Sequence, residues 1–307
     1  MEGLTKMKFL NTKENYVKAL LALFLSTIFW GSAGVVMKLS LDTISPHYLL
    51  AFRFGIAAVV MLLVFHKQLR RIGKRTFKIG AIMGIILYIE FAFYTYGLQF
   101  TTATKSNFII GAYVILVPFA YLMINRKWPG KSSFFGALIC LVGIAFVLLD
   151  DFTAINKGDF ITMVSAAGYA AHVVVTAKYV KHEDPIQLNI MQITTGAVIS
   201  LAVALTTGPV PIEYIAQEGA SFLYLGIGCT IMPYLLSVYG QQYVKTTTAA
   251  IILSFESVVG CVMAVFVLNE TLSIRVVIGA ILIVGSLLIT EVDYKKLFQK
   301  ITTKETV

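Results

Sequence analysis

The stretch YGLQFTTATKSNFII, residues 96–110, has a counterpart in YGQQYVKTTTAAIIL, residues 239–253. Both stretches open with Tyr-Gly-x-Gln, and both continue into an apolar run. The offset of 143 residues between them continues without a gap as far as Gly136 and Gly279. A pattern that recurs in the same order within one chain is typical of an internal structural repeat.

The match extends toward the N-terminus at a slightly different offset. Pro46 in SPHYLLAFRF corresponds to Pro185 in DPIQLNIMQI at an offset of 139, and the same offset aligns Trp30 with Tyr169. Any single match arises easily by chance, but matches that keep their order along each half are harder to dismiss. The sequence therefore predicts two related halves that differ by a short insertion in one loop.

The composition places these halves in a lipid bilayer. Apolar residues make up 58% of the chain, charged residues 13%, and the mean hydropathy is +0.81, which is outside the range of an ordinary soluble domain. A bilayer core of about 30 Å needs about 20 consecutive apolar residues for each helix. Ten runs fit this template: 17–37, 46–65, 77–98, 104–124, 132–149, 158–179, 186–206, 219–239, 247–268 and 273–290.

These runs predict an all-α polytopic membrane protein without a soluble domain, because the connections between them are too short to build a separate core. The repeat divides it into a first half at 17–149, a linker at 150–157 and a second half at 158–290. Each half holds five spans, so the second half must lie inverted relative to the first. Inverted repeats are the design of many secondary transporters, whose substrate site lies between the halves near the bilayer midplane.

The positive charges orient the chain in the membrane. Of the 25 Lys and Arg residues, twenty fall on the side of the N-terminus, in or beside both tails and the loops at 67–78, 126–131, 178–181 and 245. The positive-inside rule then places both tails, 1–16 and 291–307, in the cytoplasm. The net charge of +9 is explained by this asymmetry, and we expect anionic lipid rather than nucleic acid beside the basic loops.

The enzyme classes find little support in the sequence. No H-E-x-x-H, G-x-S-x-G or C-x-x-C motif occurs, and the PGKSS segment lacks the first glycine of a phosphate-binding loop. The three cysteines, Cys140, Cys229 and Cys261, lie inside predicted spans without metal-ligand spacing, so we expect buried apolar residues. The sequence thus predicts no cofactor, no metal site and no catalytic residues, and energy for any transport must come from a gradient.

Several motifs together resemble the drug/metabolite transporter superfamily, and within it the ten-span EamA-type transporters. They are FWGSAGVVMK at 29–38, the spacing of Pro46 and Arg53, the YGLQ and YGQQ stretches, Pro118, and LNETLS before the Gly-rich last span. The resemblance implies two inverted five-helix repeats with cytoplasmic ends in a bacterial plasma membrane. It also implies export of small metabolites, amino acids or drugs, often coupled to protons.

Two positions depart from the pattern of many family members. An acidic residue often ends the fourth span as Glu270 ends the ninth here, but the equivalent position holds Lys127. The ninth span often carries a proline where this chain has Ser257 after Glu256.

Three ionisable residues lie inside the predicted spans: Arg53, Glu90 and Glu256. An ionised group at the bilayer centre costs about 2.5–3.5 kcal/mol on insertion scales, so such residues are kept for a reason. Their repeat equivalents are Gln192, Pro233 and Tyr113, so the charges do not follow the symmetry of the fold. A scaffold requirement would more readily place charge in both halves, which favours a function for these side chains.

Two interpretations of the buried charges remain open. Arg53 and Glu90 lie on consecutive antiparallel spans, where they form either a static buried ion pair or part of a substrate or proton pathway. Glu256 has no obvious basic partner, which favours a functional role. His172 is either a proton relay or, as the sequence favours, a hydrogen-bonded packing histidine.

Aromatic residues and prolines complete the predicted pathway. The aromatic candidates for a cavity lining are Trp30, Phe91, Tyr94, Tyr113, Tyr169, Tyr234 and Tyr239. Such rings stack on planar groups or hold an organic cation, although ordinary packing explains each of them separately. Trp128 and Tyr294 suit an interfacial belt. Pro118 and Pro233 are predicted to interrupt their helices and act as hinges.

The sequence therefore predicts a secondary transporter, working as a monomer or homodimer, that exports a small metabolite such as an amino acid by alternating access with proton coupling. Efflux of organic cations or drugs is the first alternative. A membrane protein that moves no soluble solute, such as a lipid scramblase, sensor or scaffold, is the second.

Overall fold

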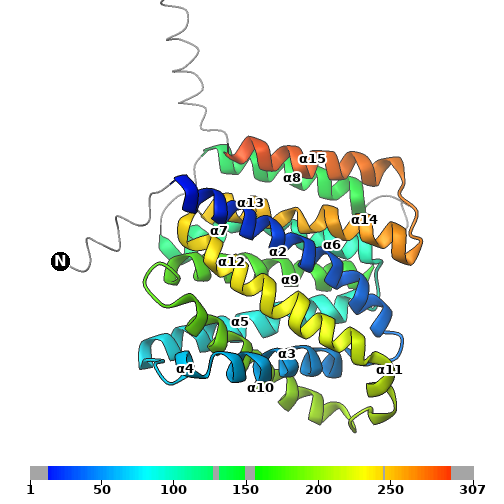
Figure 1. Ribbon diagram of the computed structural model, residues 1–307. Helices are drawn as coiled ribbons and strands as arrows, with labels where there is room; N and C mark the ends of the chain where they lie inside the picture. Colours follow the sequence, from blue (N-terminus) through cyan, green and yellow to red (C-terminus); the bar gives the residue numbers. More distant parts are fainter. Residues whose placement is uncertain (1–12, 127–130, 149–155, 245, 292–307) are drawn as a thin grey trace, which may run out of the picture.

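The protein is all-helical in the residues described by the computed structural model, which are 13–126, 131–148, 156–244 and 246–291 (Figure 1). Most of the predicted tails and of the linker 150–157 lie outside these ranges. The helices are α2 (Lys13–Ser40), α3 (Pro46–Val64), α4 (His66–Leu69), α5 (Lys74–Leu98), α6 (Ala103–Gly111), α7 (Tyr113–Asn125), α8 (Lys131–Leu148), α9 (Lys157–Tyr179), α10 (Pro185–Thr207), α11 (Ile212–Leu223), η1 (Tyr224–Ile231), α12 (Met232–Tyr243), α13 (Thr246–Ser254), α14 (Glu256–Leu268) and α15 (Ile274–Glu291).

Within these described ranges, seven helices are long and apolar enough to cross a membrane. Large apolar side chains such as Leu63, Met123 and Phe266 are 71%, 82% and 79% exposed on the outside of the bundle, as expected for residues that face lipid. The prediction of an all-α polytopic membrane protein is therefore confirmed.

Three predicted spans are interrupted. The run 104–124 is divided at Ala112 into α6 and α7, and the run 247–268 is divided at Phe255 into α13 and α14. The run 219–239 is longer than predicted and continues from α11 through the π-helical segment η1 into α12. Broken helices at membrane depth are tolerated where protein or a cavity surrounds them.

The interruptions are spaced as the sequence repeat is. Ala112 and Phe255 are 143 residues apart, which is the offset between the two Tyr-Gly-x-Gln stretches. The helices that follow them, α7 and α14, end at residues with the same left-handed conformation, Arg126 and Asn269, each with φ of 54°. The local backbone of α6–α7 is thus repeated in α13–α14.

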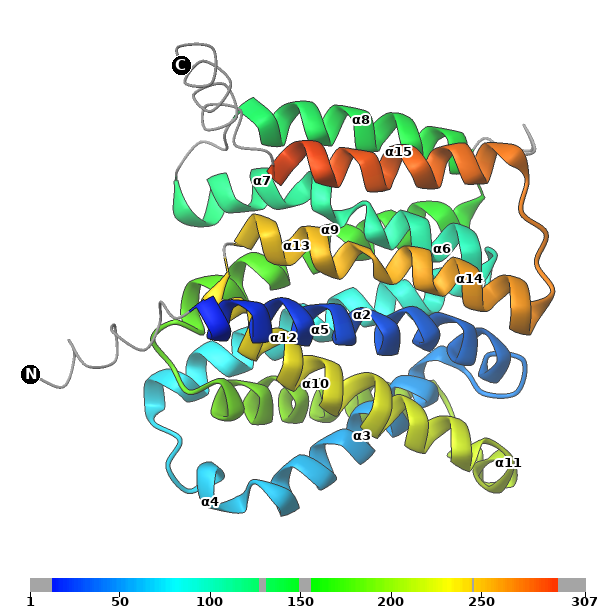
Figure 2. The same ribbon diagram turned by 45° about the horizontal axis from the view of Figure 1, so that its top comes forward.

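Two pairs of helices from different parts of the chain run in opposite directions. In Figures 1 and 2, α2 and α9 point in opposite directions along the bundle, and so do the neighbouring helices α8 and α15. The main contacts join the halves in pairs, with α5 on α9, α12 on α2, and α10 on α3. This interleaving means that side chains from both halves face the centre of the bundle.

Close approach of α5 to α10 depends on glycine. At Gly84, an added Cβ atom would lie 2.5 Å from the Cβ of Thr195 and 2.6 Å from the carbonyl oxygen of Gln192. Small residues allow helix backbones to approach closely in membranes. The α5 helix therefore packs closely against α10 at Gly84, six residues before its central carboxylate, Glu90.

Candidate functional site

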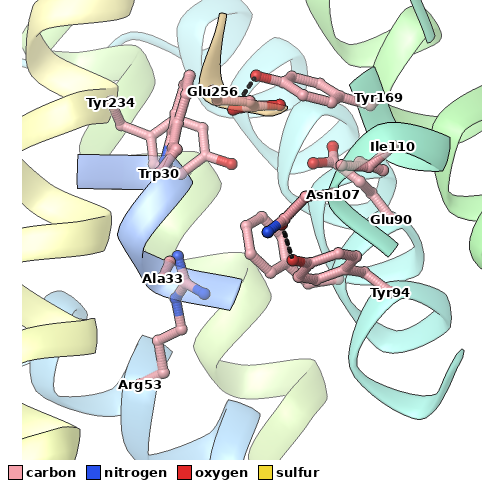
Figure 3. Close-up of a pocket in the computed structure, with 11 residues that line it drawn as sticks. Trp30, Ala33, Arg53, Glu90, Tyr94, Asn107, Ile110, Tyr169, Tyr234 and Glu256 are labelled. Carbon is pink, nitrogen blue, oxygen red and sulfur yellow. Dashed lines mark hydrogen bonds between the residues drawn. The ribbon is translucent and has the colours of Figure 1, made fainter. Parts of the chain in front are cut away.

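A small cavity lies at the centre of the bundle (Figure 3). Its volume of about 40 Å³ has room for water molecules but not for a metabolite such as an amino acid. The lining comes from both halves and consists of Trp30, Ala33, Arg53, Glu90, Phe91, Tyr94, Asn107, Ile110, Tyr169, Tyr234 and Glu256. All three predicted interior charges therefore reach one cavity.

Glu90 enters this cavity from the middle of α5. Its side chain is 4% exposed, and its Oε2 atom has no hydrogen-bond partner among the residues that the structure describes. The α9 helix lies close to Glu90. Ser165 Oγ on this helix donates a hydrogen bond to the Glu90 carbonyl oxygen at 2.7 Å. A buried carboxylate oxygen without a partner is costly. Binding of a proton or a ligand at this oxygen would remove that cost.

Glu256 is placed by the interruption of its span. It is the first residue of α14, directly after Phe255, and its side chain is 6% exposed. The N-terminus of a helix favours a negative charge, so the break at Phe255 creates a suitable position for a carboxylate inside the membrane. Tyr169 Oη donates to Glu256 Oε2 at 3.4 Å, which is a long and weak hydrogen bond.

Arg53 is fully buried on α3, and its partners differ from those of the ion pair that the sequence left open as one alternative. Its Nε donates to Thr230 Oγ1 at 2.8 Å, its Nη2 to the Cys229 carbonyl at 2.8 Å, and its Nη1 contacts Met37 Sδ at 3.1 Å. The guanidinium also lies 4.4 Å from the ring centre of Phe91. In the described part of the chain Arg53 forms no ion pair with Glu90, so the static-pair alternative does not match the geometry.

The charges lie on opposite sides of the cavity. Figure 3 shows the guanidinium of Arg53 pointing toward the cavity from one side, with the carboxylates of Glu90 and Glu256 on the other. Such a separation of charge complements a ligand that has a negative group at one end and a positive group at the other.

Aromatic rings form the wall beside the carboxylates. The indole of Trp30 meets Tyr169 and Tyr234 edge-on, with ring centres 6.1 and 5.0 Å apart. Trp30 and Tyr169 are equivalent positions of the sequence repeat, so the equivalent residues of the two halves meet at the cavity. Trp30 Nε1 is buried without a hydrogen-bond partner among the described residues, which leaves a donor at this wall.

Three predicted pathway residues lie outside the cavity lining. Tyr113 stacks behind Tyr169 with ring centres 4.1 Å apart, and its hydroxyl donates to the Ala250 carbonyl at 2.7 Å. His172 lies 2.8 Å from Gln192 Oε1 through its Nε2 atom, as a packing histidine would. Tyr239 packs against a neighbouring tyrosine of α12 rather than against the cavity.

The two predicted hinge prolines behave differently. Pro118 lies inside the continuous helix α7, so the prediction that it interrupts its helix is wrong. The interruption falls six residues earlier, at Ala112, which is the position equivalent to the break at Phe255 in the second half. Pro233 is the second residue of α12 and lies two residues after Ile231, where the π-helical segment ends, so the helix is irregular next to this proline.

Asn107 is a lining residue that the sequence analysis missed. It is 3% exposed, its Oδ1 accepts a hydrogen bond from Tyr94 Oη at 3.0 Å, and its Nδ2 has no described partner. The side chain lies beside Gly34, where an added Cβ atom would come within 2.7 Å of Asn107 Oδ1. The sequence feature that indicates Asn107 is an amide inside an apolar span, which is a weaker indication of a polar site than a charged side chain.

No group of three or more metal-ligating side chains lies together in the portion of the chain that the structure describes. Cys229 and Cys261 are buried as free thiols, as predicted. Some sequence-based predictions lie outside the described residues. They concern the side chain of Cys140 and the residues Lys127, Trp128 and Tyr294.

Comparison with known proteins places this cavity in a family. The model of the EamA-like transporter family matches residues 17–149 and again residues 156–292. The chain belongs to the EamA-like transporter family. It is therefore a multi-pass membrane protein of a family named for transport, as the resemblance in its motifs implied.

The curated relatives are named as transporters. An uncharacterized transporter of Archaeoglobus fulgidus is 30% identical and is matched over 88% of this chain and 84% of its own. The uncharacterized transporter YoaV of Bacillus subtilis is 25% identical over 87% of this chain and 94% of its own. A 25% identical relative in Rickettsia conorii, matched over 89% of this chain and 92% of its own, is named an S-adenosylmethionine uptake transporter.

A solved crystal structure shares the fold. Its TM-score to this chain is 0.71 at 17% sequence identity, and the match covers 91% of this chain and 98% of that one. At this identity the likeness concerns the fold alone.

Proposed function

We propose that this chain is a secondary active transporter that exports a small zwitterionic metabolite, such as an amino acid, with proton coupling. One observation carries the proposal: two buried carboxylates and one buried arginine, from three different helices, face one central cavity in a transporter-family fold. Buried ionisable groups in a membrane are costly and mark substrate or proton pathways.

The proposed architecture is two inverted five-span repeats, at 17–149 and 158–290, with both ends in the cytoplasm of a bacterial cell and the spans in its plasma membrane. The repeated backbone of α6–α7 and α13–α14, the opposite directions of α2 and α9 in Figure 2, and the double match of the family model support it. Inverted repeats allow a central site to open toward either side in turn.

The size of the cavity supports a mechanism of alternating access. At about 40 Å³ the cavity is too small for an amino acid, so substrate enters only when the bundle opens on one side. We place the moving points at the interruptions of the spans, Ala112, Phe255 and the segment before Pro233, because irregular backbone absorbs changes in direction.

The polar atoms of the cavity suit a zwitterion. Glu90 and Glu256 would hold an ammonium group beside the ring of Trp30, and Arg53 would face a carboxylate from the opposite side (Figure 3). The relative named for S-adenosylmethionine supports a small metabolite, although its name states uptake. The direction of export is taken from the family resemblance.

The charges that face the cavity support proton coupling. With both carboxylates ionised, Glu90, Glu256 and Arg53 together carry one net negative charge, which one proton neutralises. A buried charge cluster is much less costly when it is neutral. A zwitterion does not change this count, so a proton is expected to move with or against it as access alternates.

The same cavity also supports a second function, the efflux of organic cations. The observation that favours it is the aromatic wall of Trp30, Tyr169 and Tyr234 beside two carboxylates, because a cation binds well against ring faces and negative charge. In this case the cation replaces the neutralising proton, and neutral substitution of Glu256 would abolish cation binding.

The test uses purified protein in liposomes that contain a pH dye. Gradients of pooled amino acids, nucleosides and organic cations are imposed on wild type, Glu90→Gln and Glu256→Gln, with the exposed Glu213→Gln as a matched control. We expect amino-acid-dependent proton flux that is lost in one or both cavity variants and retained in the control. Flux that is unchanged in both cavity variants contradicts the proposed coupling, and no flux with any pool favours a protein that moves no soluble solute.

The proposed working unit is a monomer or a homodimer. Lipid surrounds the bundle as its solvent, and no nucleic-acid partner is proposed.

A further inference from the structure

The span that carries Tyr234 changes its helical form at the depth of the cavity. It begins as the α-helix α11, continues as the eight-residue π-helical segment η1, and resumes as α12. Runs of π-helix are rare, and single π turns often occur at functional sites. A π-helix is wider and shorter per residue than an α-helix, so a change of this segment to regular α-helix would lengthen it and turn the residues that follow.

Pro233 removes a hydrogen bond from this segment. Proline has no N–H group, so the carbonyl four residues earlier loses its usual helical donor. In this chain that carbonyl belongs to Cys229, the residue whose carbonyl oxygen lies 2.8 Å from Arg53 Nη2. The guanidinium therefore supplies, from another helix, the donor that the proline cannot supply.

A second bond joins Arg53 to the same segment. Its Nε donates to Thr230 Oγ1 at 2.8 Å, and the Thr230 hydroxyl donates in turn to the Leu225 carbonyl at 2.8 Å. That carbonyl is five residues back, so the hydroxyl closes a wide turn of the kind that π-helix makes. Gly226 lets the segment lie against α3, because an added Cβ atom there would come within 3.1 Å of the Arg53 carbonyl oxygen.

The held segment sets one wall of the cavity. Tyr234 directly follows Pro233, is 2% exposed, and packs against Trp30 with ring centres 5.0 Å apart. A change in the segment would therefore displace Tyr234 and the indole beside it. These contacts link Arg53 to the wall that gives the cavity its small volume of about 40 Å³.

The acceptors that occupy Arg53 are weaker than a carboxylate. They are a backbone carbonyl, a hydroxyl and a thioether, whereas guanidinium pairs most strongly, and in bidentate fashion, with carboxylates. Three of its five N–H groups have acceptors in these contacts, and the guanidinium borders the cavity. A ligand carboxylate would compete directly with the Cys229 carbonyl.

We propose that Arg53 is a shared donor, which holds the carbonyl released by Pro233 when the cavity is closed and turns to the carboxylate of a zwitterionic substrate when one binds. The loss of that bond frees the π-helical segment to change its form and move Tyr234. Substrate occupancy is thereby coupled to movement of the span. The carboxylate part of this mechanism rests on the proposed function, whereas the bond between Arg53 and the Cys229 carbonyl does not.

The first experiment tests the bond without any ligand. Melting temperatures of purified protein in detergent are measured for wild type, Arg53→Gln, Pro233→Ala and the double variant. An alanine at 233 restores the N–H that the Cys229 carbonyl lacks, so we expect the melting-temperature loss from Arg53→Gln to be at least halved in the Pro233→Ala background. Pro118→Ala is the matched control, because Pro118 is also inside a buried helix but Arg53 does not bond to its span.

The second experiment tests the exchange of partners. Binding of L-phenylalanine and of its methyl ester, which lacks the carboxylate, is measured by calorimetry for the same variants. In Pro233→Ala the Cys229 carbonyl no longer competes for Arg53, so we expect the acid to bind about threefold to tenfold more tightly while the ester is unchanged. Arg53→Gln should weaken the acid more than the ester.

Each result has a distinct meaning. Equal melting losses from Arg53→Gln in both backgrounds would overturn the bond, and equal changes for acid and ester would overturn the exchange. If neither probe binds wild type, the amino-acid part of the proposed function and the exchange both fail, but the melting experiment still decides the bond.

If Pro233→Ala does not fold, Arg53→Lys replaces it in both assays, because a lysine keeps the charge but lacks the planar fork that reaches Thr230 and the carbonyl together. Lysine that restores both melting temperature and preference for the acid would then overturn the proposal.

Discussion

Replacement of Glu270 by alanine is expected to loosen the junction between the halves at the start of α6. The carboxylate accepts hydrogen bonds from the backbone N–H groups of Ala103 at 2.9 Å and Thr104 at 3.0 Å. Thr102 Oγ1 accepts from the next N–H group, that of Lys105, at 3.1 Å. The free donors of the first helical turn are thus satisfied, two of them by a residue of the other half.

The magnitude follows from these two bonds. Ala103 and Thr104 are 0% and 5% exposed, so their N–H groups would be left largely without partners. Each buried donor left unsatisfied costs about 1–3 kcal/mol, and loss of the charge near the helix N-terminus adds about 0.3–1 kcal/mol. We expect Glu270→Ala to lower the free energy of unfolding by roughly 2–4 kcal/mol, because water at the membrane surface recovers part of the loss. Glu270→Gln keeps one acceptor oxygen and should cost about half as much.

The assay compares melting temperatures in detergent with transport in liposomes. Because α6 carries Asn107 into the cavity, Glu270→Ala should also weaken substrate transport, whereas the exposed Glu213→Ala should change neither quantity. A melting temperature equal to that of wild type in Glu270→Ala would refute the argument that this carboxylate caps α6. An equal loss in Glu270→Gln and Glu270→Ala would show that charge, rather than the number of bonds, decides the effect.

Three further predictions concern single contacts. Gly84→Ala should destabilise the α5–α10 packing by about 1–3 kcal/mol in chemical unfolding, whereas Gly55→Ala, which meets no atom within 4 Å, should be nearly neutral; equal losses would contradict the packing account. Asn107→Ala should raise the KM for transport several-fold and also lower the free energy of unfolding by about 1–3 kcal/mol, because the buried Tyr94 hydroxyl loses its acceptor; an unchanged KM would remove Asn107 from the binding site. Lys38→Met should cost about 1.5–3 kcal/mol, because Lys38 Nζ donates to the Leu98 and Thr101 carbonyls, both at 2.8 Å; unaltered unfolding would contradict this cap.

Much of the cavity could be anticipated from residue chemistry. Arg53, Glu90 and Glu256 are costly in a membrane, so their presence inside apolar runs was sufficient to single them out, and all three line one cavity. Trp30, Tyr94, Tyr169 and Tyr234 were selected as inner aromatics, and they line it too.

The predicted lining differs from the observed one for two physical reasons. Tyr113 and Tyr239 were predicted as lining aromatics, but Tyr113 packs behind Tyr169 and Tyr239 packs against Tyr243. Membrane helices are apolar on most sides, so periodicity identifies the inner face less clearly than in a soluble protein. Asn107 was missed because an uncharged amide in an apolar span carries a weaker signal than a charge.

The sequence by itself determined that this chain is a membrane protein of many helices, and it contained the internal match that predicts two related halves. Those properties depend on composition, run length and the order of motifs, which are local or one-dimensional. Only the tertiary structure decided that the spans break at Ala112 and Phe255, and that Arg53 bonds to the Cys229 carbonyl instead of Glu90. Those outcomes depend on the rotation and depth of packed helices, because a hydrogen bond between distant residues forms only when both groups come within about 3 Å.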